Sequence, residues 1–468
     1  MLWGIPGTLL GAFLALRLGA GSLWALGLCA GALGVFLLLR GRALFALPLF
    51  LGLLLLRGAI LPYVTVIPGP YELTGTVIDT PERERGQTVL VLSRVSLDGQ
   101  RVPGALELTV PYAADLAYGD ALTLKARVEP DDRGAVRSLT TVLYGAEAMG
   151  EITVRQGRAD PLYGLALRWR DKLGWAADDL FGNDAGVARG MLFGDRDDVH
   201  YLTFLAFRRS GLLHLLTVSG LHAGVVCGAA VLLIRGRRKW LRFLLSGLVL
   251  LLFCLLTGLS PSSVRAAVML LVVRFSRLLY RQDDPLSEIG CALALLLVMD
   301  PAMVTSPGFR LSFGAIWGLA CFTSWPKARK GLRGLLAGAV GVFLGTMPLL
   351  SVTGGQVSWV GVLTSVLALP VAPFFLIPGW AAVLLYPLIP GAAGLLALVP
   401  KGALYYLTTL SELVPVEGIT LPPANGAALV LWFAGMLLVS AFFLPNGKKP
   451  AWLGWGLMAA GALVWFLT

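Results

Sequence analysis

The stretch HLLTVSGLH, residues 214–222, holds two of the three histidines in this 468-residue chain and lies in one of its most hydrophobic regions. A continuous helix would place His214 and His222 on one face, together with Ser210 and close to Thr217. Polar side chains are costly at membrane depth and usually face a bundle interior or a water-filled route. The stretch therefore predicts a water-lined site, and interhelical hydrogen bonding alone is the simpler alternative.

Composition places the chain in the membrane class. Hydrophobic residues make up 57% of it and charged residues only 14%, whereas soluble domains carry about 25% charged residues. Many apolar runs reach the roughly 20 residues that a spanning helix needs. We expect a polytopic α-helical membrane protein, with retained transmembrane helices over 1–62 and a larger transmembrane channel domain over 201–468.

The charge distribution predicts a topology. The formal net charge is +11, yet residues 63–160 hold 14 acidic and 10 basic residues. The excess of Lys and Arg lies in short loops near residues 40, 235–242 and 327–333, and such loops stay in the cytoplasm. We therefore expect a multi-pass membrane protein with 63–160 extracytoplasmic, and the family resemblance given below implies the bacterial plasma (inner) membrane. A nucleic-acid footprint is not needed to explain the basic charge.

Two segments differ from the hydrophobic runs. Residues 63–160 include YELTGTVIDTP and ALTLKARVEP, where apolar and polar residues alternate between turn signals, which predicts an inserted all-β domain, a small barrel or sandwich. Residues 161–200 begin with an amphipathic segment. Trp169 and Trp175 would anchor it at the membrane interface, and packing on the β domain is the alternative.

Prolines interrupt two of the later hydrophobic segments, at positions 370, 373, 378 and 400. Proline breaks the helical hydrogen-bond ladder, and freed backbone groups in a membrane must be buried in protein or face water. The pattern indicates broken helices beside a cavity, with a merely kinked packing helix as the alternative.

Few residues point to bound groups or covalent chemistry. Arg265 and Arg310 are cations in apolar surroundings, and a cation facing a pore suits a polyanion. Asp195 to Asp198 are expected in a solvated turn. Two histidines without a nearby acid make a metal site unlikely to form, and the five cysteines offer no CxxC pair. We expect no metal, no cofactor and no enzymatic activity.

Four motifs carry a family resemblance: GMLFGDRDDV (190–199), SGLLHLLTVSGLHAGVV (210–226), SPSSVRAAVM (260–269) and DPAMVTSPGFRLSFGA (300–315). In this order and spacing they resemble the competence domain of the ComEC family of DNA-import channel proteins. The likeness runs from about residue 20 to about 440. It implies an OB-fold-like extracytoplasmic domain and a channel that moves single-stranded DNA inward across the inner membrane during natural transformation.

The resemblance and the residue patterns meet in the histidine stretch. We expect the residues that line or shape the route, with two phosphate-facing cations, to be Ser210, His214, Thr217, Ser219, Gly220, His222, Arg265 and Arg310. The partners that the resemblance implies are single-stranded DNA, membrane lipids and an extracellular DNA receptor. The oligomeric state is left open.

The chain also departs from the family pattern. It holds no HxHxDH cluster of the metallo-β-lactamase domain that many members carry, so a separate nuclease is expected. It holds no GxxxxGK[ST] phosphate loop, so a cytoplasmic DNA-translocating ATPase would supply the driving force. The β domain is acidic and poor in aromatic residues, which favours guiding DNA over gripping it. Thr364 stands where the pattern has Asn, which puts an amide-specific role there in doubt.

Two other functions remain open at this point. A small-molecule or ion transporter would also use broken helices and intramembrane histidines. An intramembrane hydrolase would use Ser219 as nucleophile and a histidine as base, but the sequence shows no acid to orient that histidine.

Overall fold

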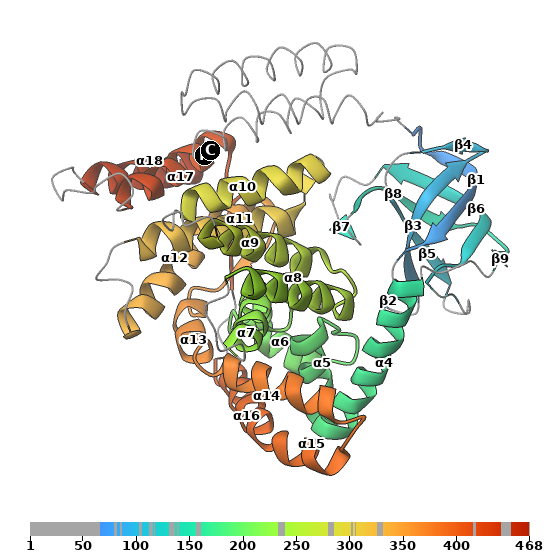
Figure 1. Ribbon diagram of the computed structural model, residues 1–468. Helices are drawn as coiled ribbons and strands as arrows, with labels where there is room; N and C mark the ends of the chain where they lie inside the picture. The colour runs from blue at the N-terminus through green and yellow to red at the C-terminus, as the bar shows by residue number, and fades with distance from the viewer. Residues whose placement is uncertain are drawn as a thin grey trace. The chain divides into compact units, whose positions relative to one another are not determined.

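The computed structural model shows a mostly helical protein with a small β barrel-like region in its N-terminal part (Figure 1). The helices expected within 1–62 lie outside the described residues. The structure describes residues 66–78, 82–84, 87–102, 105–111, 116, 118–130, 136–137, 140–155, 161–232, 239–278, 285–300, 303–304, 306–324, 331–414, 418–440 and 451–467.

Five long strands close the barrel-like region: β1 (Gly69–Val77), β3 (Gln87–Leu97), β5 (Ala105–Pro111), β6 (Ala121–Pro130) and β8 (Thr140–Ala148). They pair in the order β8-β5-β3-β1-β6, and a further β6–β8 pairing closes the ring. The β5–β8 pair is parallel, and the other four pairs are antiparallel. Four short strands extend the ring: β2 (Glu82–Glu84), β4 (Gln100–Arg101), β7 (Val136–Arg137) and β9 (Thr153–Arg155).

Alternation along the strands fills the barrel. In β6, Leu122, Leu124 and Val128 are buried, whereas Lys125 and Arg127 between them are exposed. This period of two is what a strand with one core face requires. The core that results consists largely of leucine and valine, with Tyr144 and Ala146 from β8, so the predicted all-β segment is confirmed as a small barrel-like region.

The chain divides into two compact units, residues 1–175 with 226–306 and residues 176–225 with 307–468. The described helices of the first unit are most of α4 (Pro161–Phe181), the end of α7 (Gly220–Leu232), α8 (Lys239–Leu256), α9 (Pro261–Leu278) and α10 (Pro285–Met299). Within this unit the hydroxyl of Tyr163 on α4 donates a hydrogen bond of 3.2 Å to the carbonyl of Gly258, in the turn after α8. Trp169 and Trp175 are exposed, and their role as membrane anchors stays a prediction.

The second unit contains the histidine stretch, residues 214–222. Its helices in chain order are α5 (Ala185–Phe193), α6 (Tyr201–Arg209), the start of α7 (Gly220–Leu232), α11 (Pro307–Thr323), α12 (Gly331–Val352), α13 (Gly361–Ala368), α14 (Ala372–Leu385), α15 (Pro390–Leu396), α16 (Leu398–Glu412), α17 (Gly426–Val439) and α18 (Ala451–Leu467). A short pair of strands, β10 (Gln356–Val357) and β11 (Ile419–Thr420), joins two of its connections.

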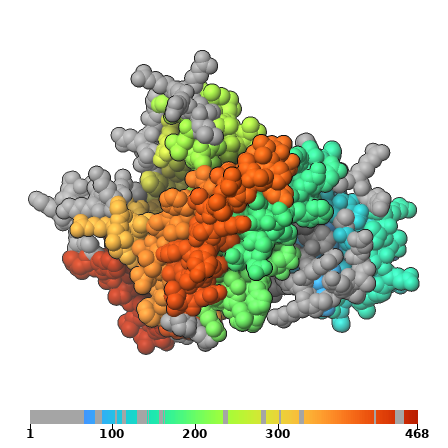
Figure 2. All heavy atoms as spheres, turned by 90° about the horizontal axis from the view of Figure 1, so that it is seen from below, coloured from blue at the N-terminus to red at the C-terminus, as the bar shows by residue number. Residues whose placement is uncertain are grey.

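Aromatic contacts hold α4 and α5 against α14 within this unit. Phe181 packs on Phe375 with ring centroids 5.9 Å apart, and Phe193 meets Trp380 edge-on at 5.2 Å. Figure 2 shows the orange surface of α14–α16 lying directly against the green surface of the preceding helices. The segment around α5 is thereby fixed to the bent helices near the C-terminal end of the unit.

Several helices are apolar enough to cross a membrane. Among the described residues, α8 and α12 qualify singly by length and composition, and two bent pairs qualify if each is one span. The pair α13–α14 bends by 51° and the pair α15–α16 by 44°. The first bend lies at Pro370. The second lies just before Pro400, because the ring of a proline clashes with the carbonyl four residues earlier. The predicted broken helices are confirmed, although Pro378 lies inside α14 without ending it.

Candidate functional site

The histidine segment is not a continuous helix. It leaves helical geometry after α6, forms a single 3-10 turn η3 (Leu213–Leu215), and becomes helical again only at Gly220. The expectation that one helix would carry both histidines is therefore wrong. Gly211 has a φ of +75°, a left-handed conformation that glycine adopts without strain, and this residue redirects the chain. We call residues 210–219 the helix break.

A second segment of the same unit supports the start of this break. A Cβ added to Gly211 would lie 2.6 Å from the Cα of Gly361, so two backbones meet here without side chains between them. Thr364 donates a hydrogen bond of 2.6 Å to the carbonyl of Ser210, and Ser358 donates one of 2.9 Å to the carbonyl of Arg209. These hydroxyls satisfy carbonyls that the end of α6 leaves without intrahelical partners.

Ser210 therefore belongs to packing and not to an open surface. The residue is fully buried, and its own hydroxyl donates to the carbonyl of Phe207 at 3.2 Å. Ser210 therefore stays in the candidate site only as a residue that shapes the helix break.

The two histidines differ in their surroundings. His214 is exposed, and its Nδ1 lies 3.0 Å from the carbonyl of Gly211. The hydroxyl of Thr217 donates to the carbonyl of His214 at 3.1 Å, which tightens the turn. His222 is completely buried on the first turn of α7. The two imidazoles therefore lie in different local environments, one in the helix break and one in the helix that follows it.

Ser219 and His222 form a direct pair. The Oγ of Ser219 lies 2.8 Å from Nδ1 of His222. Ser219 precedes the first residue of α7, a position where serine is favoured because its hydroxyl can satisfy the open end of a helix. Nε2 of His222 has no hydrogen-bond partner of normal geometry in the described part of the chain, although the carbonyl of Leu215 lies close enough to affect the ring.

An unpartnered buried ring nitrogen costs free energy unless water or a ligand reaches it. The pair can therefore receive a proton, a water molecule or a polar group of a passing ligand at Nε2. No carboxylate contacts either residue within the described ranges, so the orienting third member of a catalytic triad is not recorded there.

The glycines near the pair do not support close helix packing. A Cβ added to Gly220 or Gly224 would meet nothing within 4 Å among the described residues. Gly220 is also exposed. Of Gly211, Gly220 and Gly224, only Gly211 makes a close backbone contact among the described residues.

The two arginines occupy separate places. Arg310 is partly buried in the first turn of α11, in the same unit as the histidines. Arg265 lies on α9 in the other unit, is 7% exposed, and follows a cluster of serine hydroxyls in which Ser260 and Ser263 lie 3.0 Å apart.

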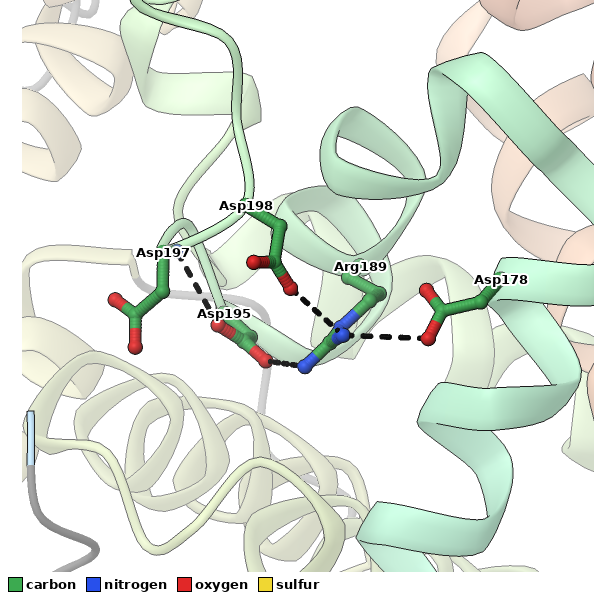
Figure 3. Close-up of polar contacts among 5 residues, drawn as sticks. All are labelled: Asp178, Arg189, Asp195, Asp197 and Asp198. Carbon is green, nitrogen blue, oxygen red and sulfur yellow. Dashed lines mark hydrogen bonds and ion pairs between the residues drawn. The ribbon is translucent and has the colours of Figure 1, made fainter. Parts of the chain in front are cut away.

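A cluster of charges surrounds Arg189 on α5 and was not predicted from the sequence (Figure 3). The Nη1 atom of Arg189 lies 3.4 Å from Asp178 on α4 and 2.9 Å from Asp198, while its Nη2 pairs with Asp195. Asp197 points away from Arg189, but its backbone amide donates to Asp195 at 3.3 Å. We call Asp178, Arg189, Asp195 and Asp198 the Arg189 clamp.

The expectation of a solvated turn at 195–198 is thus wrong for Asp195, whose side chain is only 16% exposed. Burial of Arg189 would by itself lower its pKa, but the charge of Asp195, its hydrogen bond and the charges of Asp178 and Asp198 outweigh burial and raise that pKa. The sequence signal was present: three carboxylates lie within 11 residues of Arg189, which stands in an otherwise apolar helix.

The fold and site define a helical, apolar protein with an inserted small barrel and an interrupted helix that carries a buried Ser–His pair. The sequence matches the family model described as competence protein over residues 191–445. This range covers more than half of the chain, and the chain therefore belongs to the competence protein family.

Relatives with curated names share limited identity. The chain is 30% identical to ComE operon protein 3 of Bacillus subtilis over 203 residues. The aligned region covers 43% of this chain and 26% of that protein. The chain is 26% identical over 219 residues to Recombination protein 2 of Haemophilus influenzae, covering 41% and 27%. Competence protein ComA of Neisseria gonorrhoeae is 27% identical over 344 residues, covering 64% and 48%. The matches thus span less than half of each relative. No solved structure matches the chain.

Proposed function

We propose that this protein takes part in DNA uptake during natural transformation and passes single-stranded DNA across the inner membrane. Membership of the competence protein family and the names of two relatives, ComE operon protein 3 and Competence protein ComA, support the process. The observation that carries the channel role is the helix break, which holds a buried histidine with an unpartnered nitrogen inside a hydrophobic region.

The hydrocarbon core of a membrane contains no water that could form hydrogen bonds with exposed backbone groups. Irregular backbone at bilayer depth is tolerated only where it is buried in protein or lines a water-filled cavity. The start of the break is buried against α13, and the exposure of His214 supports a water-filled path beside the rest of it. Thr217 and Ser219 are proposed to border this route, while the buried residues Ser210 and His222 shape it from behind.

Arg310 and Arg265 are proposed as the cations that meet phosphate groups. A guanidinium is always charged and binds phosphate through two parallel hydrogen bonds, which suits a polyanion with a phosphate at every nucleotide. The bent pairs α13–α14 and α15–α16 support a wet interior, because discontinuous helices frame transport sites in other membrane proteins.

The barrel is proposed to be an extracytoplasmic OB-fold-like domain. Its five closing strands, with one parallel pair between β5 and β8, support that assignment. Its outward residues on β6 include Lys125, Arg127 and Glu129, a mixed set that favours guiding a strand over binding it tightly. An extracellular receptor, a cytoplasmic ATPase and a separate nuclease are the proposed partners, and no catalytic activity is proposed for this chain.

A transformation assay tests the proposal in a transformable host. Strains with the wild-type gene, a deletion, His214→Ala/His222→Ala or His200→Ala are compared for uptake of a selectable DNA. We expect the deletion and the double variant to lose transformation and His200→Ala to retain it, because His200 is exposed before α6, outside the helix break. Normal transformation by the deletion strain would overturn the proposal.

The Ser219–His222 contact of 2.8 Å favours a second candidate, an intramembrane hydrolase in which Ser219 is the nucleophile and His222 its base. Turnover of labelled lipid or peptide substrates by purified wild-type protein and by Ser219→Ala separates this candidate. Turnover that Ser219→Ala abolishes supports it, and equal or absent turnover in both proteins removes it.

A further inference from the structure

The Arg189 clamp joins three segments that are separate along the chain. Asp178 lies in the last turn of α4, Arg189 lies in α5, and Asp195 and Asp198 lie in the loop 194–200 that follows α5. Because all three carboxylates converge on one guanidinium, the loop is fixed at two of its residues to the helices on either side of Gly182 (Figure 3).

Close backbone contacts fix the position of this loop against α5. A Cβ added to Gly186 would collide with the backbone carbonyl of Asp198. A Cβ added to Gly190 would lie 3.4 Å from the carbonyl oxygen of Asp195 and 3.5 Å from that of Leu216. The loop therefore has little freedom to shift, and Gly190 lies between it and the helix break.

The other side of the loop contacts the helix break directly. Gly194 has a φ of +80°, and a Cβ added to it would lie 3.1 Å from Cγ2 of Val218. Val218 is 2% exposed and immediately precedes Ser219. The chain of contacts thus runs from Arg189 through Asp195 and Gly194 to Val218, one residue before the Ser219–His222 pair.

We propose that Arg189 is a positioning residue: through its carboxylate partners it holds loop 194–199 against Val218 and so fixes the turn that presents Ser219 and His222. The inference rests on the proposed function for its role in transport, but its geometry does not depend on what is transported. The part played by Arg189 is indirect, since the contacts described for it are with carboxylates and not with the pair itself.

Arginine suits this task better than lysine. Its planar guanidinium offers several N–H donors in fixed directions. Here Nη1 donates hydrogen bonds to two carboxylates, and Nη2 donates one to a third. The ammonium of lysine is a compact point charge that cannot reproduce this arrangement. Removing the arginine leaves three neighbouring carboxylates that repel one another, and removing one carboxylate as well relieves part of that repulsion.

The test uses full-length protein in membranes, with the native cysteines replaced and Ser219→Cys introduced as a reporter. The rate at which a small hydrophilic maleimide alkylates the new thiol measures how the turn is presented. We expect Arg189→Gln to change this rate about tenfold, within the range of coupling seen for residues in one charge network. Arg189→Lys should give an intermediate rate, and Arg189→Gln/Asp195→Asn should return toward the parent rate.

Arg127→Gln is the matched control, because Arg127 pairs with Glu129 at 3.7 Å on the exposed surface of the barrel. Its alkylation rate should equal that of the parent. If Arg189→Gln fails to accumulate, Arg189→Lys and Asp195→Asn are measured in its place. An unchanged rate in every clamp variant that accumulates would overturn the inference.

The alkylation rate separates this inference from the proposed function. A changed rate in the Arg189 variants, together with normal transformation by the deletion strain, would keep the positioning role and reject DNA import. An unchanged rate, together with loss of transformation in the deletion strain, would reject the positioning role alone.

Discussion

Thr364 on α13 donates a hydrogen bond of 2.6 Å to the backbone carbonyl of Ser210 at the end of α6, and both residues are at most 1% exposed. The two lie 154 positions apart in the chain. The position needs a donor toward a carbonyl, and the threonine hydroxyl supplies one, as the amide of the asparagine expected from the resemblance would.

Thr364→Val should destabilise the protein, because valine keeps the shape of threonine but leaves the Ser210 carbonyl without this donor in a buried place. The expected loss is about 1–3 kcal/mol, measured as the unfolding temperature of the detergent-solubilised protein. Thr364→Ser retains the hydroxyl and should lose less. Equal unfolding temperatures for Thr364→Val and the wild type would show that the hydrogen bond contributes nothing measurable.

Gly211→Ala should be more harmful than Gly182→Ala. Both glycines have positive φ, +75° and +58°, so each alanine meets the same backbone penalty of about 1–2 kcal/mol. Only at Gly211 does the new Cβ also overlap a neighbour, 2.6 Å from the Cα of Gly361. The overlap should add about 1–3 kcal/mol, visible as a lower unfolding temperature. Matching losses in the two variants would contradict the close α6–α13 contact.

Gly318→Ala should separate α11 from α12. A Cβ at Gly318 would collide with the backbone carbonyl of Gly341, and Gly314 and Gly345 meet one turn away in the same manner. Such small-residue faces let membrane helices approach closely, and we expect a loss of about 1–3 kcal/mol. The measurement is the fraction of protein that remains monodisperse on size-exclusion chromatography after heating.

Gly402→Ala is the control for this prediction, since a Cβ there meets nothing within 4 Å among the described residues. Alanine favours a helix interior over glycine by about 1 kcal/mol, so this variant should be as stable as the wild type or slightly more stable. A heat-sensitive Gly402→Ala together with an unaffected Gly318→Ala would reverse the expected order and reject the packing.

Leu106→Ala should open the barrel, because Leu106 is fully buried in β5. The cavity and lost burial should cost about 2–5 kcal/mol, detected as faster trypsin cleavage of the region 66–155 in the full-length protein. Val154→Ala on β9, where the side chain is 40% exposed, should leave the cleavage rate unchanged. Equal cleavage rates for the two variants would contradict the core of the barrel.

Much of the fold was predictable because its signals are local. Alternation of apolar and polar residues in segments such as ALTLKARVEP requires strands with one buried face, and proline interrupts helices wherever it removes a backbone donor. The bends of α13–α14 and α15–α16 followed from this rule. The break at 210–219 did not, because Gly211 is compatible with a helix and only its packing against Gly361 requires the left-handed turn.

The candidate site was only half predictable for the same reason. His214, Ser219 and His222 can be identified from the sequence as polar residues in an apolar stretch, and the structure pairs Ser219 with His222. Arg189 and Asp178 do not, because a charged residue on a short amphipathic segment is normally solvated. Their importance appears only when the chain folds back and places three carboxylates around one guanidinium.

The sequence alone determined the class of this protein: an apolar, helix-rich chain with an inserted barrel and the motifs of the competence protein family. Composition and local periodicity depend only on which residues stand at neighbouring positions, so they can be obtained without the fold. The tertiary structure alone decided where the helix breaks, which serine meets which histidine, and what holds that turn. Those outcomes depend on contacts between segments far apart in the chain, such as Thr364 with Ser210 and Gly194 with Val218, whose energies no local pattern encodes.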